Sequence, residues 1–247
     1  QAIAQLENNQ LDEATTGFRT IIELTPNESL GYQNLTITAL LKLAALNKAQ
    51  EPDAYSSTQA ELAETLTSWA SIHGESPQQV ILSARMYEAI EDRAAAIAAY
   101  LRAAELSKTD PVLPYQAFQL MQQRADEYDV SEKKAAIAET YQRSPENIAV
   151  VVAYLRFLAE TQDDLFLEIL EQARDLFIPL SVRVRETLPK LLDKAASAVK
   201  GGDWKIAQTQ IGFTGNLLLA EIAYTNDLNR LNPHPLEYVA MDFSEDF

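Results

Sequence analysis

Apolar residues recur along most of the chain at spacings of three and four, which is the period of a helix with one buried face. In the first such stretch, this stripe begins after the polar turn 8–10 and stops at Pro26. A proline stops a helix because it lacks a backbone N–H and restricts the residue before it. The pattern therefore predicts a helix that follows the turn and ends before Pro26.

The same pattern returns most fully between residues 80 and 106. Small and large residues alternate by position on two stripes, at Ala84, Tyr87, Ala96, Tyr100, Ala103 and Leu106. A polar turn at Glu91 and Asp92 separates the stripes. Small residues let antiparallel helices cross closely, and large residues fill the space where they diverge. We therefore expect a helical hairpin here.

Further helical pairs are expected along the rest of the chain. The segment 30–76 reads as a longer hairpin, with a helix over about 30–48, a polar loop over 49–57 and then a second helix. Two more pairs are expected at 112–124 with 132–143 and at 148–160 with 165–177. After residue 177 the sequence pattern changes, and Pro179 and Pro189 bracket a segment that contains Arg183 and Arg185. The glycines at 201–202 end one helix, Trp204 opens the next, and a long apolar helix covers about 215–231.

These hairpins resemble the tetratricopeptide repeat (TPR), in which small and aromatic residues and a final proline hold fixed places in roughly 34 residues. The resemblance implies an all-α fold, a right-handed α-α superhelix of about six helical pairs, some of them degenerate. It divides the chain into an array over 1–178 and a helical pair over 179–235 that continues or caps the array. Residues 236–247 are then a tail, or a linker to a further domain.

A second resemblance concerns the C-terminal part. It is carried by Gly202-Asp203-Trp204, Ala207, Asn216-Leu217-Leu218, Tyr224, Asp227-Leu228 and Pro235-Leu236-Glu237. This run resembles the stretch that joins TPR repeats to an FG-GAP/VCBS propeller in bacterial CRTAC1-like (ASPIC/UnbV) proteins. The resemblance implies a larger exported protein, periplasmic or extracellular, in which this region contacts a following propeller; without it, a cytoplasmic location is expected.

Composition supports helix and excludes several classes of function. The chain has only 7 Gly and 10 Pro in 247 residues, too few for the frequent turns of a β-sandwich or propeller. No run approaches the ~18 apolar residues of a membrane span. The net charge of −16 argues against nucleic acid as a partner, because phosphate backbones are bound by clustered Lys and Arg. Basic residues nevertheless outnumber acidic ones between 174 and 205. This asymmetry suits a basic partner at the N-terminal array or an acidic partner surface at the C-terminal part, or it only keeps the protein soluble.

The residues give no sign of catalytic chemistry. There is no cysteine, and the two histidines, His73 and His234, lack any metal-ligand spacing. No glycine-rich phosphate loop is present, and carboxylates three apart, such as Glu61 and Glu64, are typical of a solvated helix face. We therefore expect no catalytic residues, no metal site and no cofactor, and we interpret Trp69 as a packing residue.

The TPR resemblance also implies where a ligand binds, because the first helix of each pair lines the concave face. By position, the partner-binding residues are Gln33, Ile37, Gln78, Arg85, Glu88, Gln119, Gln122 and Tyr154. Amide-rich contacts suit an extended peptide backbone. The leading hypothesis is a protein-interaction scaffold that binds a peptide or a partner domain. The alternatives are a helical-repeat enzyme or glycan-handling module, and a structural spacer or self-association module.

Overall fold

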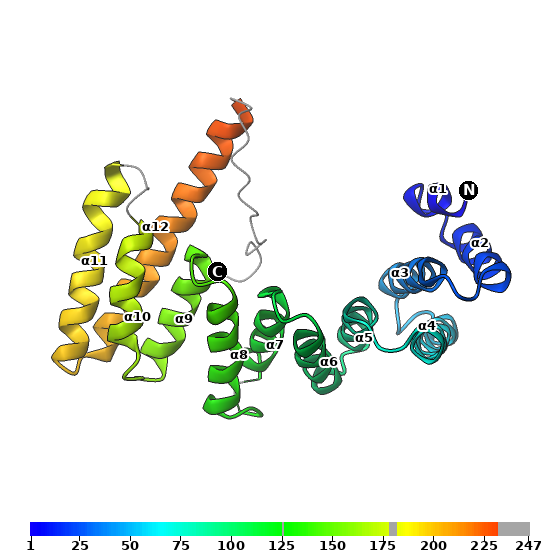
Figure 1. The fold of residues 1–247 in the computed structure, drawn as a ribbon, viewed down its shortest axis with the longest axis horizontal. Helices are drawn as coiled ribbons and strands as arrows, with labels where there is room; N and C mark the ends of the chain where they lie inside the picture. The colour runs from blue at the N-terminus through cyan, green and yellow to red at the C-terminus, as the bar shows by residue number, and fades with distance from the viewer. Residues whose placement is uncertain (125, 178–181, 232–247) are drawn as a thin grey trace. The chain divides into compact units, whose positions relative to one another are not determined.

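The computed structural model describes residues 1–124, 126–177 and 182–231 (Figure 1). This described part consists of twelve α-helices and one short 3-10 helix, with no strand in it. The chain divides into two compact units, Gln1–Ser144 and Pro145–Phe247. The all-α prediction is confirmed.

The first unit holds four pairs of consecutive helices. Its helices are α1 (Ala2–Glu7), α2 (Leu11–Leu24), α3 (Ser29–Ala45), α4 (Pro52–His73), α5 (Pro77–Ala89), α6 (Arg93–Leu106), α7 (Val112–Gln122) and α8 (Val130–Arg143). Each helix packs against the next along the chain, and α3 also contacts α5. Figure 1 shows these helices following one another in chain order, as expected of a repeat array.

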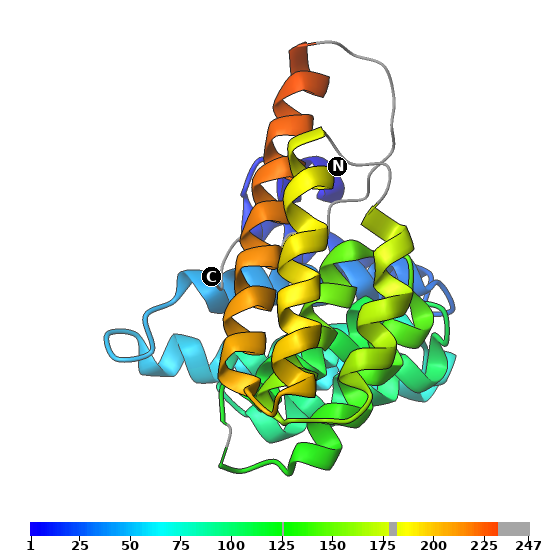
Figure 2. The ribbon, with the colours of Figure 1, turned by 90° about the vertical axis from the view of Figure 1, so that its left-hand side faces the viewer.

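The described residues of the second unit form two pairs. Its helices are α9 (Ile148–Glu160), α10 (Phe166–Ala173), the 3-10 helix η1 (Arg174–Phe177), α11 (Val182–Lys200) and α12 (Trp204–Leu231). The long helices α11 and α12 lie side by side (Figure 2), and α12 also packs on α9. With the four pairs of the first unit, this arrangement confirms the predicted six helical pairs.

The hairpin of α5 and α6 shows why the repeat pattern requires small residues. Ala84 on α5 and Ala96 on α6 are fully buried, and Ala103, two turns further along α6, is buried as well. Together with Tyr100 they belong to one apolar cluster that also takes in buried residues along the whole of α7, from Leu113 to Met121. A larger side chain at Ala84 or Ala96 would push the two helices apart.

Four of the six pairs turn from their first to their second helix in the same way. The second residue after the first helix adopts a positive φ, between 53° and 79°, at Asn9, Glu91, Gln162 and Gly202. The following backbone N–H then bonds back to a carbonyl five residues earlier, each at 2.8 Å, in the pairs Gln10–Gln5, Asp92–Tyr87, Asp163–Leu158 and Asp203–Ala198. This is the Schellman geometry, and it recurs in both units.

Three features differ from the sequence prediction. Helix α4 begins at Pro52, so the predicted loop 49–57 is too long; a proline at the first helical position needs no N–H partner, and Tyr55 is buried within the helix. Pro189 lies inside α11 instead of bounding a segment. The helix that Trp204 opens, as predicted, runs on without a break through the predicted start of the long apolar helix near 215, so the two form one helix, α12.

The predicted domain boundaries stay predictions. The boundary at 178/179 falls within 178–181, and the tail 236–247 lies beyond Leu231, so both predictions lie outside the described residues.

Candidate functional site

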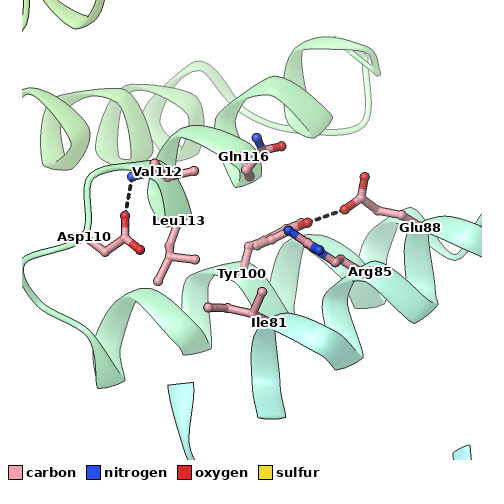
Figure 3. Close-up of a pocket in the computed structure, with 8 residues that line it drawn as sticks. All are labelled: Ile81, Arg85, Glu88, Tyr100, Asp110, Val112, Leu113 and Gln116. Atoms are coloured by element: carbon pink, nitrogen blue, oxygen red, sulfur yellow. Dashed lines mark hydrogen bonds between the residues drawn. The ribbon is translucent and has the colours of Figure 1, made fainter. Parts of the chain in front are cut away.

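A pocket of about 460 Å³ opens among α5, α6 and α7 of the first unit (Figure 3). One face of α5 supplies Ile81, Arg85 and Glu88, at helical spacings of four and three. The remaining lining comes from α6, from the loop after it and from the first turns of α7: Tyr100, Asp110, Val112, Leu113 and Gln116. We call this the α5–α7 pocket.

Tyr100 forms the floor of the pocket and is held by a carboxylate. Its ring is buried in the core, while its hydroxyl donates a hydrogen bond to Oε1 of Glu88. Burial raises the pKa of Tyr100 far above its usual value, the Glu88 carboxylate raises it further, and nearby Arg85 offsets part of the increase. Tyr100 therefore stays a hydrogen-bond donor to Glu88 throughout the physiological pH range.

Arg85 differs from most arginines of the first unit. Four others are paired with carboxylates: Arg19 with Glu61, Arg102 with Glu75, Arg124 with Glu127 and Arg143 with Glu139. Arg85 is exposed, forms no ion pair with any residue the structure describes, and lies beside the Tyr100 hydroxyl (Figure 3). Its guanidinium group is thus available to a ligand.

The loop between α6 and α7 is fixed by two sets of hydrogen bonds. Oδ1 of Asp110 accepts from the backbone N–H of Val112 at 2.9 Å, which satisfies a free donor at the start of α7. From α8, Arg143 donates to the carbonyls of Ala104, Ser107 and Asp110 at 2.7–2.8 Å. These bonds hold the wall of the pocket that carries Asp110 and Val112.

The pocket combines apolar walls with both hydrogen-bond donors and hydrogen-bond acceptors. Ile81, Val112 and Leu113 present apolar surface, and Arg85 offers hydrogen-bond donors. Glu88 and Asp110 offer acceptors at the same opening. Its eight lining residues include no serine, cysteine or histidine that could serve as a nucleophile or base in the usual triads. The arrangement is suited to binding.

The structure brings together two of the sequence-predicted site residues, Arg85 and Glu88, in the α5–α7 pocket. Gln78 lies in the first turn of α5, outside the lining. Gln119 and Gln122 are half-buried on α7, beyond Gln116.

The other three predicted residues lie elsewhere. Gln33 and Ile37 are half-buried on α3, where Ile37 packs against the cluster shared by α3, α4 and α5. Tyr154 belongs to α9 in the second unit and is only 3% exposed, which leaves little of its surface for a partner.

Sequence reasoning missed the part of the pocket that comes from beyond α5. The repeat pattern predicts that Tyr100 fills space between helices, which is true of its ring but not of its hydroxyl. Asp110 and Val112 lie in a loop and at a helix start, where no helical periodicity marks a face. Gln116 could have been predicted from the sequence, because it precedes the predicted Gln119 by three residues and so shares a face of the same helix.

Other predictions about chemistry concern single residues. The ring of His73 packs edge-on against Tyr32 at 5.6 Å between centroids, and His234 lies outside the described residues. Trp69 is buried in the core, as predicted. Within the ranges that the structure describes, no three His, Cys, Asp or Glu residues gather as a metal site would require, and no helix is long and apolar enough to span a bilayer.

Comparisons with known proteins find similar chains among solved structures. No protein-family model matches the chain, and no curated protein matches its sequence. Among solved structures, it is similar to a thermophilic TPR protein of Thermus thermophilus, with 17% identity and a TM-score of 0.49 over 64% of this chain and 77% of that one. It is also similar to YrrB, a TPR protein with an unusual peptide-binding site, with 16% identity and a TM-score of 0.47 over 71% of this chain and 82% of that one.

The helical pairs of the chain itself define a TPR-like helical-repeat fold. Identities this low give no residue-by-residue correspondence, so the function has to follow from the pocket's own geometry.

Proposed function

We propose that this protein is a protein-interaction scaffold and that its α5–α7 pocket receives an extended segment of a partner protein. The observation that carries the proposal is the exposed Arg85, a cation without a carboxylate partner in the described chain, at the opening of a pocket with apolar walls. A guanidinium at such a place gains charge-assisted hydrogen bonds when a ligand supplies the acceptor.

The size and lining of the pocket suit one or two side chains of a peptide. A volume of about 460 Å³ lies within the range of small-ligand sites. An apolar ligand side chain would pack against Ile81, Val112 and Leu113. A ligand carbonyl or carboxylate would accept from Arg85, and ligand N–H groups would donate to Glu88 or Asp110.

The predicted amides extend this site along the two helices that bound it. Gln119 follows the pocket residue Gln116 on α7, and Gln78 precedes Ile81 on α5. Both carry a donor and an acceptor, as an extended peptide backbone requires. We infer that they contact the parts of the segment that leave the pocket.

A selection from a displayed random-peptide library tests the proposal. Enriched peptides would be synthesised and their affinity for the chain measured by calorimetry, with the Arg85→Ala variant in parallel. Loss of a hydrogen bond to a charged group is worth about 1.5–3 kcal/mol, so we expect affinity to fall by about 10- to 100-fold.

Arg93→Ala is the matched control. Arg93 opens α6, does not line the pocket, and likewise forms no ion pair with described residues. Its replacement should leave peptide affinity unchanged. A library that yields no saturable peptide, or peptides that bind Arg85→Ala as well as the parent chain, would contradict the proposal and favour the spacer alternative.

A further inference from the structure

The last helix of the second unit exposes an apolar stripe. Ile206 and Phe213 on α12 are 47% and 55% exposed, and the half-buried Leu217 and the exposed Ala220 continue the same side of the helix at helical spacing. We call these four residues the α12 stripe. Single exposed apolar residues are ordinary, but a row of them along one helix indicates a contact surface.

The opposite side of α12 is already occupied. Ala207, Ile211 and Leu218 are buried there. The side-chain amide of Gln208 donates to the carbonyl of Ala159 on α9 at 3.1 Å. The α12 stripe is therefore the side of the helix that the described residues of this unit leave uncovered.

Exposed basic residues accompany the stripe in this unit. They are Arg185, Lys190, Lys194 and Lys200 on α11 and Lys205 at the start of α12. None of them forms an ion pair with a described residue. Arg174 of the same unit instead pairs with both Glu171 and Asp193 at 2.7 Å, so Glu186 is the remaining exposed acid of α11. These five basic residues outnumber the unpaired exposed acids among them, Glu186 and Asp203, in a chain whose net charge is −16.

The chain carries a segment of matching chemistry after α12. Residues 236–247, which lie outside the described part, contain several large apolar residues and four acidic ones but no Lys or Arg. The apolar residues after Leu236 are Tyr238, Val239, Met241, Phe243 and Phe247, and the acidic ones are Glu237, Asp242, Glu245 and Asp246. Apolar residues interleaved with acids complement an apolar stripe in a unit that also exposes these basic residues, one of which, Lys205, directly precedes Ile206.

The segment is also long enough to reach the stripe. At a rise of 1.5 Å per residue, Leu217 and Ile206 lie about 21 and 37 Å back along α12 from its end at Leu231. At about 3.3 Å per residue, an extended chain spans about 23 Å from Leu231 to Tyr238 and about 40 Å to Phe243. A chain that runs back along α12 can therefore place these aromatic residues over the stripe.

We propose that residues 236–247 bind the α12 stripe of their own chain, with aromatic side chains on Ile206, Phe213 and Leu217 and with carboxylates facing the basic residues of α11 and the start of α12. The contact is intramolecular and independent of the α5–α7 pocket.

Paramagnetic relaxation in the 247-residue chain tests this proposal. Since the sequence has no cysteine, Ser244→Cys introduces a single site for a nitroxide label. We expect the label to broaden the backbone amide signals of α12 between Ile206 and Leu217. We also expect the broadening to weaken at high salt, because the ion pairs at an exposed contact are screened.

Two variants and one mixed sample make the test decisive. Phe213→Ser should abolish the broadening with helix content unchanged by circular dichroism, since the side chain is exposed. Leu165→Ser, at another exposed apolar residue of the same unit, should preserve it. A lack of broadening, broadening that survives Phe213→Ser, or broadening seen only between labelled and unlabelled chains in a mixture would overturn the proposal; the last result would assign the stripe to a second copy.

Discussion

At the scale of single residues, the shared turn geometry has an energetic cost at three of its four positions. Asn9, Glu91 and Gln162 adopt a left-handed conformation that glycine accepts without strain, as Gly202 does in the fourth turn. For other L-residues this conformation costs roughly 1–2 kcal/mol, less for Asn. Replacing such a residue by glycine would remove this strain, but the gain would be partly offset because glycine loses more backbone entropy on folding.

The exposed Glu91 offers a direct measurement of this strain. We expect Glu91→Gly to raise the free energy of unfolding by about 0.5–1 kcal/mol, measured by urea denaturation. The matched control is Glu64→Gly, at an exposed position inside α4, where glycine should lower stability by about 1 kcal/mol. Changes of the same sign in both variants would contradict the assignment of strain to the turn.

Tyr100 makes stability depend on alkaline pH. Its pKa is raised above the ordinary 10.0, chiefly by burial and then by Glu88, so the folded state holds this proton more tightly than the unfolded state. The resulting contribution to stability is fully present below pH 10.0 and is lost as the pH rises above that value.

We therefore expect Tyr100→Phe to lower the free energy of unfolding by about 1–2 kcal/mol at neutral pH, because the bond to Glu88 is lost. The variant should also lose less stability than the parent chain between neutral pH and pH values above 10.0. Urea denaturation across this range measures both effects. Tyr87→Phe, on the same hairpin and half-buried, is the control and should keep the alkaline loss; equal pH profiles for Tyr100→Phe and the parent would contradict the prediction.

At the scale of elements, the sequence predicts well what local interactions determine. The turns at 8–10, at Glu91-Asp92 and at 201–203 are confirmed, because each joins two periodic stripes through residues that favour turns. The misreading of Pro189 shows the opposite case. The buried residues Val184, Leu188, Leu192 and Ala195 continue one helical stripe across it, and this packing outweighs the single backbone hydrogen bond that a proline removes.

Arg143 connects α8 to the end of α6 in a way that no local pattern reveals. Its side chain is 7% exposed, and the carbonyls of Ala104, Ser107 and Asp110 that accept from it lie 33–39 residues earlier. We expect Arg143→Ala to cost about 3 kcal/mol or more, because three carbonyls lose a charged donor.

The control for this prediction is Arg124→Ala, which removes an exposed ion pair with Glu127 and should change stability by less than about 1 kcal/mol. Thermal denaturation of both variants is the measurement. Comparable shifts in melting temperature would show that the bonds of Arg143 contribute no more than an exposed pair.

At the scale of the whole molecule, the number of helical pairs could be read from periodicity, but the pocket could be read only in part. Arg85 and Glu88 were found because they share a face of one helix. The sequence does not predict Asp110 and Val112 as site residues. They come to lie beside Arg85 and Glu88, more than twenty residues earlier in the chain, only because α7 packs on α6. Helical periodicity reports which side of an element is buried, and it carries no information on which neighbour completes a binding surface.

The repeated turn geometry also bears on how such a chain can change in length. Each left-handed residue stands at the same distance from the helix before it, and the next backbone amide closes back on that helix at 2.8 Å in all four cases. A gene duplication whose ends fall at two of these turns would insert intact modules with their junctions already formed. The turns are thus natural recombination points, at which modules can be gained or lost without redesign of the helices that flank them.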